Sequence, residues 1–402
     1  MQKSFIFIFI TVLIDVIGLG IIIPILPDLI MNLTHTDLAT ASKYSGWMAA
    51  CYAIMLFICA PIMGALSDQY GRRPILLISL FFFGLDYVLQ GFAPSLSWLF
   101  VGRIIAGITG ASFSTASAFI SDLSTPDKKA QNFGIIGAAF GLGFIIGPML
   151  GGILGNYGLR VPFFGSAILA GVNLIFGYFI LPESLKKENR RVFDWRRANP
   201  IGTLRVLTKY SVLKSFLLIL VLVYVAHYSL QSTWSFYTMY KFKWDHKMVG
   251  YSLAFVGLMM AIVQGGLTRI IIPRLGQNKS IYLGLILASL GYLAYAFAPN
   301  GWSMYVIMIP FSISGISGPS IQGLIANQVP ANGQGELQGG MTALMCLTSI
   351  IGPLIMTKLF NSCTEVNAFV FFPGAPFFMA FLLTGIALFL TVKLLSNPLS
   401  KN

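Results

Sequence analysis

The sequence has few charged residues for its length. Asp, Glu, Lys and Arg make up only 10% of its 402 residues, whereas soluble proteins carry about 25%. Hydrophobic residues reach 56%, above the roughly 45–50% of soluble proteins. No water-soluble fold can cover so much apolar surface with so little polar material, and this excludes a soluble enzyme and a soluble nucleic-acid-binding protein.

Cysteine and catalytic motifs are also scarce. The four cysteines (Cys51, Cys59, Cys346 and Cys363) form no C-x-x-C pair and have no zinc-site spacing. The sequence contains no G-x-x-x-x-G-K-[ST], G-x-S-x-G or H-E-x-x-H motif, which are the signatures of a phosphate-binding loop, a serine hydrolase and a zinc protease. We therefore expect no enzyme, no metal and no cofactor.

The sequence is instead dominated by long apolar segments. A helix needs about 20 mostly apolar residues to cross the ~30 Å core of a bilayer. Twelve segments meet this requirement and predict an all-α membrane protein of twelve transmembrane helices: 4–30, 45–66, 75–93, 97–120, 132–154, 162–182, 213–238, 248–270, 279–298, 302–325, 337–358 and 375–396.

The positive charges predict how these spans are oriented. With the N-terminus in the cytoplasm, nineteen of the 26 Lys and Arg residues fall on the cytoplasmic side and six on the other, and Arg103 lies inside a span. Basic residues concentrate in cytoplasmic loops, so we expect both termini in the cytoplasm. The net charge of +13 then reflects topology and attraction to anionic lipid, and no nucleic-acid partner is expected.

One long polar stretch, residues 183–212, divides the chain into predicted halves of six spans each, 1–182 and 213–402. Two landmarks recur 205 residues apart: Phe92-Ala93-Pro94 returns as 297–299, and Ile145-Ile146-Gly147-Pro148 returns as 350–353. A third, Gly71-Arg72-Arg73, is echoed about 202 residues later by 274–276. The sequence therefore predicts two pseudo-symmetric halves. Transporters use such repeats to place a binding site at the interface between the halves.

The loop between the second and third spans carries a dense motif from Gly64 to Pro74. Gly71 permits a tight turn, and Asp68 can accept N–H groups at a neighbouring helix N-terminus. Arg72 can pair with Asp122 at the end of the fourth span, which would hold the cytoplasmic side closed. A loop that only follows the positive-inside rule is the alternative, above all for Arg73.

The fifth span carries a second motif. Gly143, Gly147 and Gly151 are four residues apart, so they line one helix face and allow another helix to pack closely. Pro148 lacks an N–H group and favours a kink. Helix packing alone is the alternative explanation for this pattern.

Both motifs resemble those of the major facilitator superfamily, and the second is typical of its drug–proton antiporters. The likeness extends to the tetracycline–proton antiporter branch, through Asp15-Val16-Ile17-Gly18, Leu85-Asp86-Tyr87, Gly102-Arg103, Glu336-Leu337-Gln338-Gly339 and Gly352-Pro353-Leu354. It implies twelve helices, a bacterial inner membrane, and drug export in exchange for protons. The sequence departs from that branch at 258–264 and 285–289, which lack its typical His and Asp, so metal-bound tetracycline is not implied as the substrate.

Ionisable residues inside spans are costly and point to function. Asp15 lies near the middle of the first span, where burial favours its protonated form. Asp86 and Arg103 share a depth in the third and fourth spans, so they can pair. We expect these three residues to couple protons to transport. The alternatives are a bracing salt bridge for Asp86 and Arg103, and a carboxylic acid held protonated for packing at Asp15.

The second half offers polar but few ionisable groups in its spans. His227, Gln231 and Trp234 recur at helical spacing on roughly one face, and Gln264 and Gln322 lie in later spans. Such a stripe suits a cavity for an amphipathic organic molecule, and a packing face is the alternative.

Together these patterns predict a monomeric, proton-coupled secondary exporter of drug-like organic molecules. Two other functions remain open at this point. The same fold could carry another organic solute, such as a siderophore or a metabolite, by antiport or symport. The chain could also be a membrane receptor that transports nothing.

Overall fold

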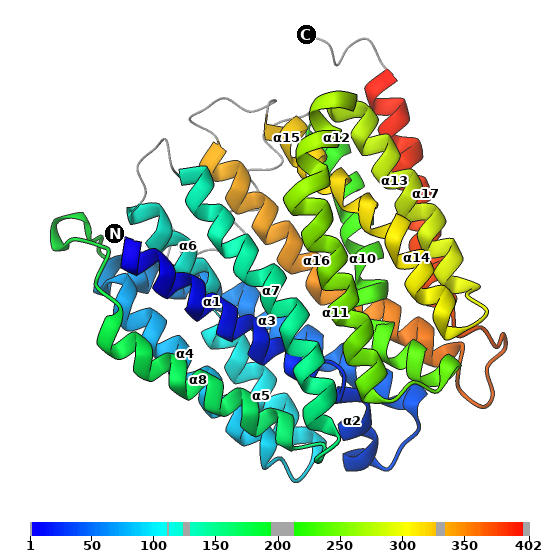
Figure 1. Ribbon diagram of the computed structural model, residues 1–402, viewed down its shortest axis with the longest axis horizontal. Helices are drawn as coiled ribbons and strands as arrows, with labels where there is room; N and C mark the ends of the chain where they lie inside the picture. The colour runs from blue at the N-terminus through cyan, green and yellow to red at the C-terminus, as the bar shows by residue number, and fades with distance from the viewer. Residues whose placement is uncertain (1, 111, 124–128, 194–212, 327–333, 397–402) are drawn as a thin grey trace. The chain divides into compact units, whose positions relative to one another are not determined.

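The computed structural model describes residues 2–110, 112–123, 129–193, 213–326 and 334–396, and within them it contains helices and no strand (Figure 1). Each of the twelve predicted spans coincides with one helix or with a run of helices broken by a short irregularity. Ten described helices are long and apolar enough to cross a membrane, or eleven when the bent pair α1 and α2 counts as one span.

Eight spans are single helices, because the apolar run continues without a break. They are α3 (Leu38–Tyr70), α4 (Arg72–Gly91), α7 (Lys129–Gly155), α8 (Val161–Ile180), α10 (Leu213–Phe242), α13 (Gln277–Ala296), α16 (Gln334–Ser362) and α17 (Ala375–Ser396).

Four spans are interrupted. The first consists of α1 (Gln2–Ile22) and α2 (Leu26–Thr34), bent by 48°. The fourth consists of α5 (Leu96–Thr109) and α6 (Ser112–Leu123). The eighth runs from α11 (His246–Ile262) through a π-helical turn (Val263–Leu267) into α12 (Thr268–Leu275). The tenth runs from α14 (Gly301–Ile313) through a 3-10 turn into α15 (Ser317–Ala326).

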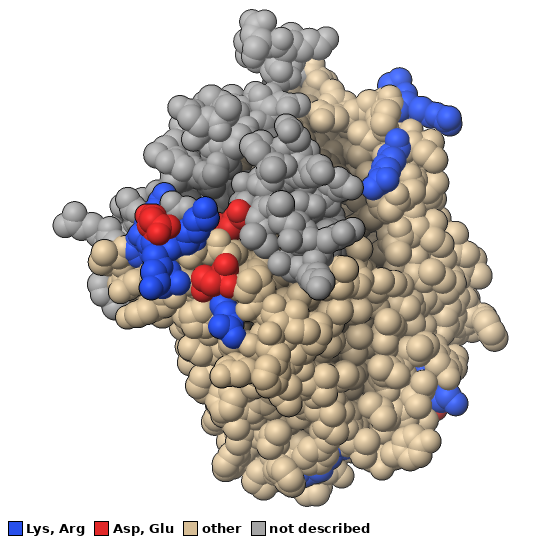
Figure 2. Space-filling view, turned by 60° about the vertical axis from the view of Figure 1, so that its left-hand side comes forward, with Lys and Arg blue, Asp and Glu red and all other residues tan. Residues whose placement is uncertain are grey.

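The surface of these helices suits lipid. Along α8 one face is apolar and exposed, with Ile168 at 68% and Phe179 at 78% exposure, while Ala170, Asn173 and Gly177 on the other side are buried. Figure 2 shows a wide zone without charged side chains along the helices, with Lys, Arg, Asp and Glu gathered near the helix ends. A soluble protein rarely exposes such large apolar patches, whereas a bilayer solvates them.

The helices form two compact units. Unit 1 comprises residues 1–36, 51–200 and 245–257, and unit 2 comprises 37–50, 201–244 and 258–402. Each unit therefore takes one short segment from the other predicted half of the sequence. The division into six-helix halves at 1–182 and 213–402, joined by 183–212, stays a prediction.

The internal repeat is visible in the backbone. α4 and α13 both begin after a glycine with positive φ, Gly71 at +106° and Gly276 at +78°, and both end at a phenylalanine, Phe92 and Phe297. Both pairs of positions lie 205 residues apart. The Gly71 motif therefore repeats with the same offset as the other two landmarks, and the offset of about 202 residues taken from the sequence is wrong. α1 packs on α7 and α8 in unit 1 as α10 packs on α16 and α17 in unit 2, which supports the duplication.

Candidate functional site

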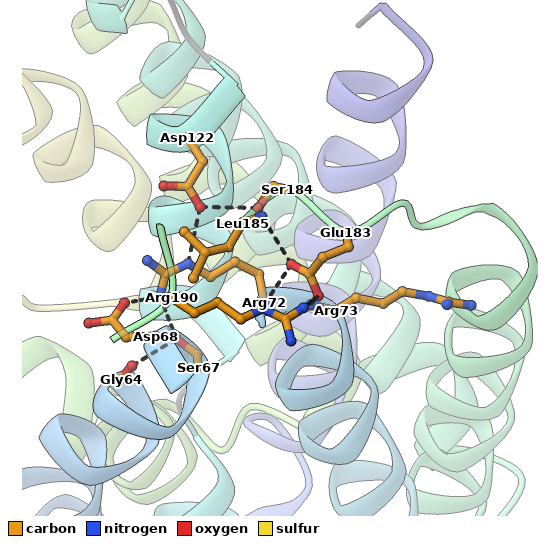
Figure 3. A network of polar contacts seen from close by, with 10 residues as sticks. All are labelled: Gly64, Ser67, Asp68, Arg72, Arg73, Asp122, Glu183, Ser184, Leu185 and Arg190. Atoms are coloured by element: carbon orange, nitrogen blue, oxygen red, sulfur yellow. Dashed lines mark hydrogen bonds and ion pairs between the residues drawn. The ribbon is translucent and has the colours of Figure 1, made fainter. Parts of the chain in front are cut away.

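A polar network surrounds the start of α4 in unit 1 (Figure 3). Arg72, only 9% exposed, donates from Nε to Asp122 Oδ2 at 3.1 Å. Its Nη1 lies 2.6 Å from Asp68 Oδ1 and also contacts Ser67 Oγ. A guanidinium held by two carboxylates from different helices joins the end of α3 to the end of α6. The predicted pairing of Arg72 with Asp122 is present.

The N–H groups at the start of α4 are capped by Glu183, which lies beyond the end of α8. Its two carboxylate oxygens accept from Arg72 N at 2.8 Å and Arg73 N at 3.3 Å. A carboxylate is favoured here because the first N–H groups of a helix lack partners and its dipole attracts negative charge. Gly71 has to be glycine, because its φ is +106° and a Cβ would collide with the Glu183 carboxylate.

The polypeptide that follows Glu183 lies across the loop between α3 and α4. Ser184 Oγ donates to Asp122 Oδ2 at 3.1 Å, and Arg190 Nη2 lies 3.8 Å from Glu183 Oε2. Arg191 N donates to the backbone carbonyl of Asp68 at 3.1 Å. The beginning of the predicted linker is therefore bound to the Arg72 network by both side-chain and backbone contacts.

The remaining residues of the loop motif differ in how many contacts they make. Arg73 donates to the Tyr178 carbonyl at 2.6 Å and lies over its ring, so it braces α4 against the end of α8. A Cβ on Gly64 would meet no heavy atom within 4 Å. The sequence predicts that Asp68 accepts helix N–H groups, but at α4 Glu183 accepts them, and Asp68 forms an ion pair with Arg72.

The glycines of α7 face α1. A Cβ on Gly143 would press on Val16, one on Gly147 on the Ile17 carbonyl, and one on Gly151 on the Ile21 backbone. The predicted close helix packing is thus present, with α1 as the partner. α7 continues as one helix through Pro148, and the Pro148 carbonyl lies against Gly250 at the start of α11.

Asp86 and Arg103 meet inside the spans, as their shared depth predicts. Arg103 Nη2 lies 3.2 Å from Asp86 Oδ2, and the Gln90 amide donates to Asp86 Oδ1 at 2.7 Å. Asp86 is fully buried, and a Cβ on Gly102 would touch it. A buried ion pair is costly to break by removing one partner, so Asp86 and Arg103 hold α4 against α5.

Asp15 lies in α1 and is tied to α8. The Asn173 amide nitrogen lies 3.1 Å from the Thr11 carbonyl and 3.4 Å from Asp15 Oδ1. Asn173 is fully buried. Asp15 is partly exposed, so its carboxyl group is less enclosed than that of Asp86.

The polar residues predicted for the second half separate in unit 2. His227 and Gln231 of α10, Gln264 of the π-helical turn and Gln322 of α15 are exposed. Trp234 is 3% exposed and packs edge-on against Tyr295 and Phe377. Of the three residues predicted to share one exposed face, His227 and Gln231 are exposed, whereas Trp234 belongs to the core of unit 2.

Sequence reasoning missed Glu183, Gln90 and Asn173. Gln90 is four residues after Asp86 in one helix, and Asn173 interrupts an apolar span, so both carried a signal. Glu183 carried none, because it begins a polar linker and its partners lie 111 and 110 residues away in the sequence.

Comparison with known proteins identifies the family. The family model of the Major Facilitator Superfamily matches residues 8–353. The chain is 38% identical to the tetracycline resistance protein, class C, of Escherichia coli, covering 92% of this chain and 93% of that protein. It is 33% identical to the class H protein of Pasteurella multocida, covering 96% of each.

A solved structure gives the same fold. The human organic anion transporter MFSD10 superposes with a TM-score of 0.74 at 23% identity, covering 97% of this chain and 99% of that one. The predicted superfamily, its all-helical fold and the likeness to the tetracycline branch are confirmed. This chain belongs to the Major Facilitator Superfamily.

Proposed function

We propose that this chain exports a drug-like organic molecule of the tetracycline type in exchange for protons, by alternating access. The observation that carries the proposal is the 38% identity, over more than nine tenths of both chains, to a protein named for tetracycline resistance. This likeness does not favour a siderophore, a metabolite or a receptor role.

The proton-coupling groups are Asp86 with Arg103, and Asp15. Protonation of Asp86 removes the charge that holds Arg103 and leaves a buried guanidinium without its counter-ion, which destabilises this arrangement and favours a rearrangement of the helices. Asp15 accepts a proton while Asn173 continues to bind its neutral form. Each proton that enters along a membrane potential contributes about 2.3 kcal/mol per 100 mV, which supplies the driving force for export.

The Arg72 network acts as the gate of the cycle. Asp68, Asp122 and Arg72 join three helix ends, so they favour one arrangement of unit 1 until the network breaks. The glycine face of α7, with Gly143, Gly147 and Gly151, allows α1 to stay close while other helices move.

The drug binds to the exposed polar groups of unit 2. His227, Gln231, Gln264 and Gln322 offer neutral donors and acceptors on helices that are otherwise apolar, which suits an amphipathic organic molecule. Trp234 shapes this surface from behind and does not itself touch the drug.

The chain lies in a bacterial inner membrane with both termini in the cytoplasm, because basic residues dominate the loops on that side. Under this orientation the Arg72 network faces the cytoplasm. One chain contains both predicted halves, so a monomer is sufficient for transport.

The test is drug-driven proton movement in inverted membrane vesicles. Tetracycline added to acidified vesicles that contain the wild-type chain should release protons. Asp86→Asn and Asp15→Asn should each reduce this release at least tenfold, while the exposed control Asp37→Asn should not. If both span variants release protons like the wild type, the coupling assignment is wrong. If the wild type releases none with any drug, the export proposal fails.

A further inference from the structure

A second cluster of polar groups lies in unit 1, outside the network at Arg72. His246, the first residue of α11, has Nδ1 3.4 Å from Asp28 Oδ2 of α2. Its Nε2 lies 3.2 Å from Asn156 Oδ1, directly after the end of α7. The imidazole thus joins α11 to two segments that are 218 and 90 residues away in the sequence.

Both ring nitrogens face an oxygen atom. A neutral imidazole has one N–H donor and one acceptor nitrogen, whereas the protonated ring has two donors. The protonated ring therefore satisfies both contacts, and it adds an ionic attraction to Asp28. We propose that His246 is a proton-binding site whose protonation fastens the start of α11 to α2 and α7.

Helix ends surround the ring. Asp28 lies in the first turn of α2, where the helix dipole favours its negative charge and burial disfavours it. The end of α7 at Gly155 presents its negative pole to the ring, because a Cβ there would touch His246 Cδ2 and Nε2. The positive pole of α11 acts in the opposite sense, but Asp245 caps it by accepting from Met248 N at 2.8 Å.

Lys247 is the remaining charged neighbour on α11. Its Nζ lies 5.9 Å from the centre of the Tyr251 ring, one turn further along the helix, and forms a cation–π contact with it. The carboxylate in contact with the imidazole is that of Asp28.

Next to the His246 cluster, the backbone at the start of α11 is packed closely against α7. A Cβ on Gly152 would collide with the His246 carbonyl and the Lys247 backbone, and one on Gly250 with the Pro148 carbonyl. Residues 245–257 come from the predicted second half of the sequence, yet they pack within unit 1. Any motion that carries them with the rest of α11 has to break the His246 contacts first.

Only the protonated ring can donate to both oxygen atoms, so the cluster should tighten when His246 gains a proton. This site shares no residue with the proposed proton-coupling set of Asp15, Asp86 and Arg103. Under the proposed orientation it faces the side from which protons enter.

Amide hydrogen exchange of peptides from 245–257 tests the proposal on the whole purified chain, at pH 5.5 and pH 7.5, with exchange times corrected for the intrinsic pH dependence. In the wild type, opening should be about two- to fivefold rarer at pH 5.5, as for a partly buried ion pair. His246→Gln and Asp28→Asn should each abolish this difference. His35→Gln is the matched control, because His35 is exposed at the end of α2, and it should keep the difference.

A wild type without pH-dependent exchange in 245–257, or a difference that persists in either His246→Gln or Asp28→Asn, overturns the proposal. The two variants reach the same contact from different helices, so poor folding of one leaves the other decisive. Drug transport is not needed for this readout. A failed transport test and a failed exchange test are therefore separate results.

Discussion

Replacing Glu183 should loosen the start of α4 and with it the Arg72 network. Glu183→Ala removes the acceptors for Arg72 N and Arg73 N and the anion beside Arg190. Glu183→Gln keeps one acceptor oxygen and removes the charge. The two changes separate the hydrogen bonds of the cap from its electrostatic part.

The magnitude follows from the cap geometry. Loss of a side-chain cap costs about 0.5–2 kcal/mol, and the helix dipole adds about 0.3–1 kcal/mol for a carboxylate at an N-terminus. The Glu183 and Arg190 side chains are 27% and 28% exposed, and their charged atoms lie 3.8 Å apart, so we assign that pair less than about 0.5 kcal/mol. We expect a loss of about 1–2 kcal/mol for Glu183→Ala and about half of this for Glu183→Gln.

The measurement is thermal unfolding of the purified chain in detergent, together with drug-driven proton release from vesicles. Glu188→Ala is the matched control, because Glu188 is an exposed acid in the same stretch. Glu183→Ala should lower the unfolding midpoint and change the rate of proton release, and Glu188→Ala should do neither. Equal behaviour of the two variants in both assays would refute the role of the cap.

Two further predictions follow from the packing and from a thiol. Gly147→Ala should destabilise the chain by about 1–3 kcal/mol, because the added methyl group overpacks against the Ile17 carbonyl. Gly64→Ala should be neutral or mildly stabilising, because its methyl group meets open space. Equal unfolding midpoints for the two variants would contradict this prediction. Burial raises the pKa of the Cys363 thiol above its ordinary value, and only the thiolate reacts. In a chain whose other three cysteines are replaced by alanine, the rate of maleimide labelling should therefore still be rising above pH 8.5. A plateau in the labelling rate below that pH would show that the pKa of the thiol is not raised.

The spans and several pairs were accessible from the sequence. Lipid offers no hydrogen bonds, so an apolar run of sufficient length has to become a helix, and the run lengths alone place the twelve spans. Depth along a span follows from a rise of 1.5 Å per residue. That regularity predicts that Asp86 lies level with Arg103, and the contact is present at 3.2 Å.

The tertiary structure decided which way each helix is turned and which distant segment reaches it. Helical periodicity places Trp234 on a face with His227, but only packing against Tyr295 and Phe377 makes it a core residue. The cap at α4 comes from Glu183, more than a hundred residues away, and a polar linker gives no local signal of where it will lie. Sequence fixes length, depth and periodicity because these are properties of one helix, whereas rotation and long-range capping depend on the neighbours that each helix meets.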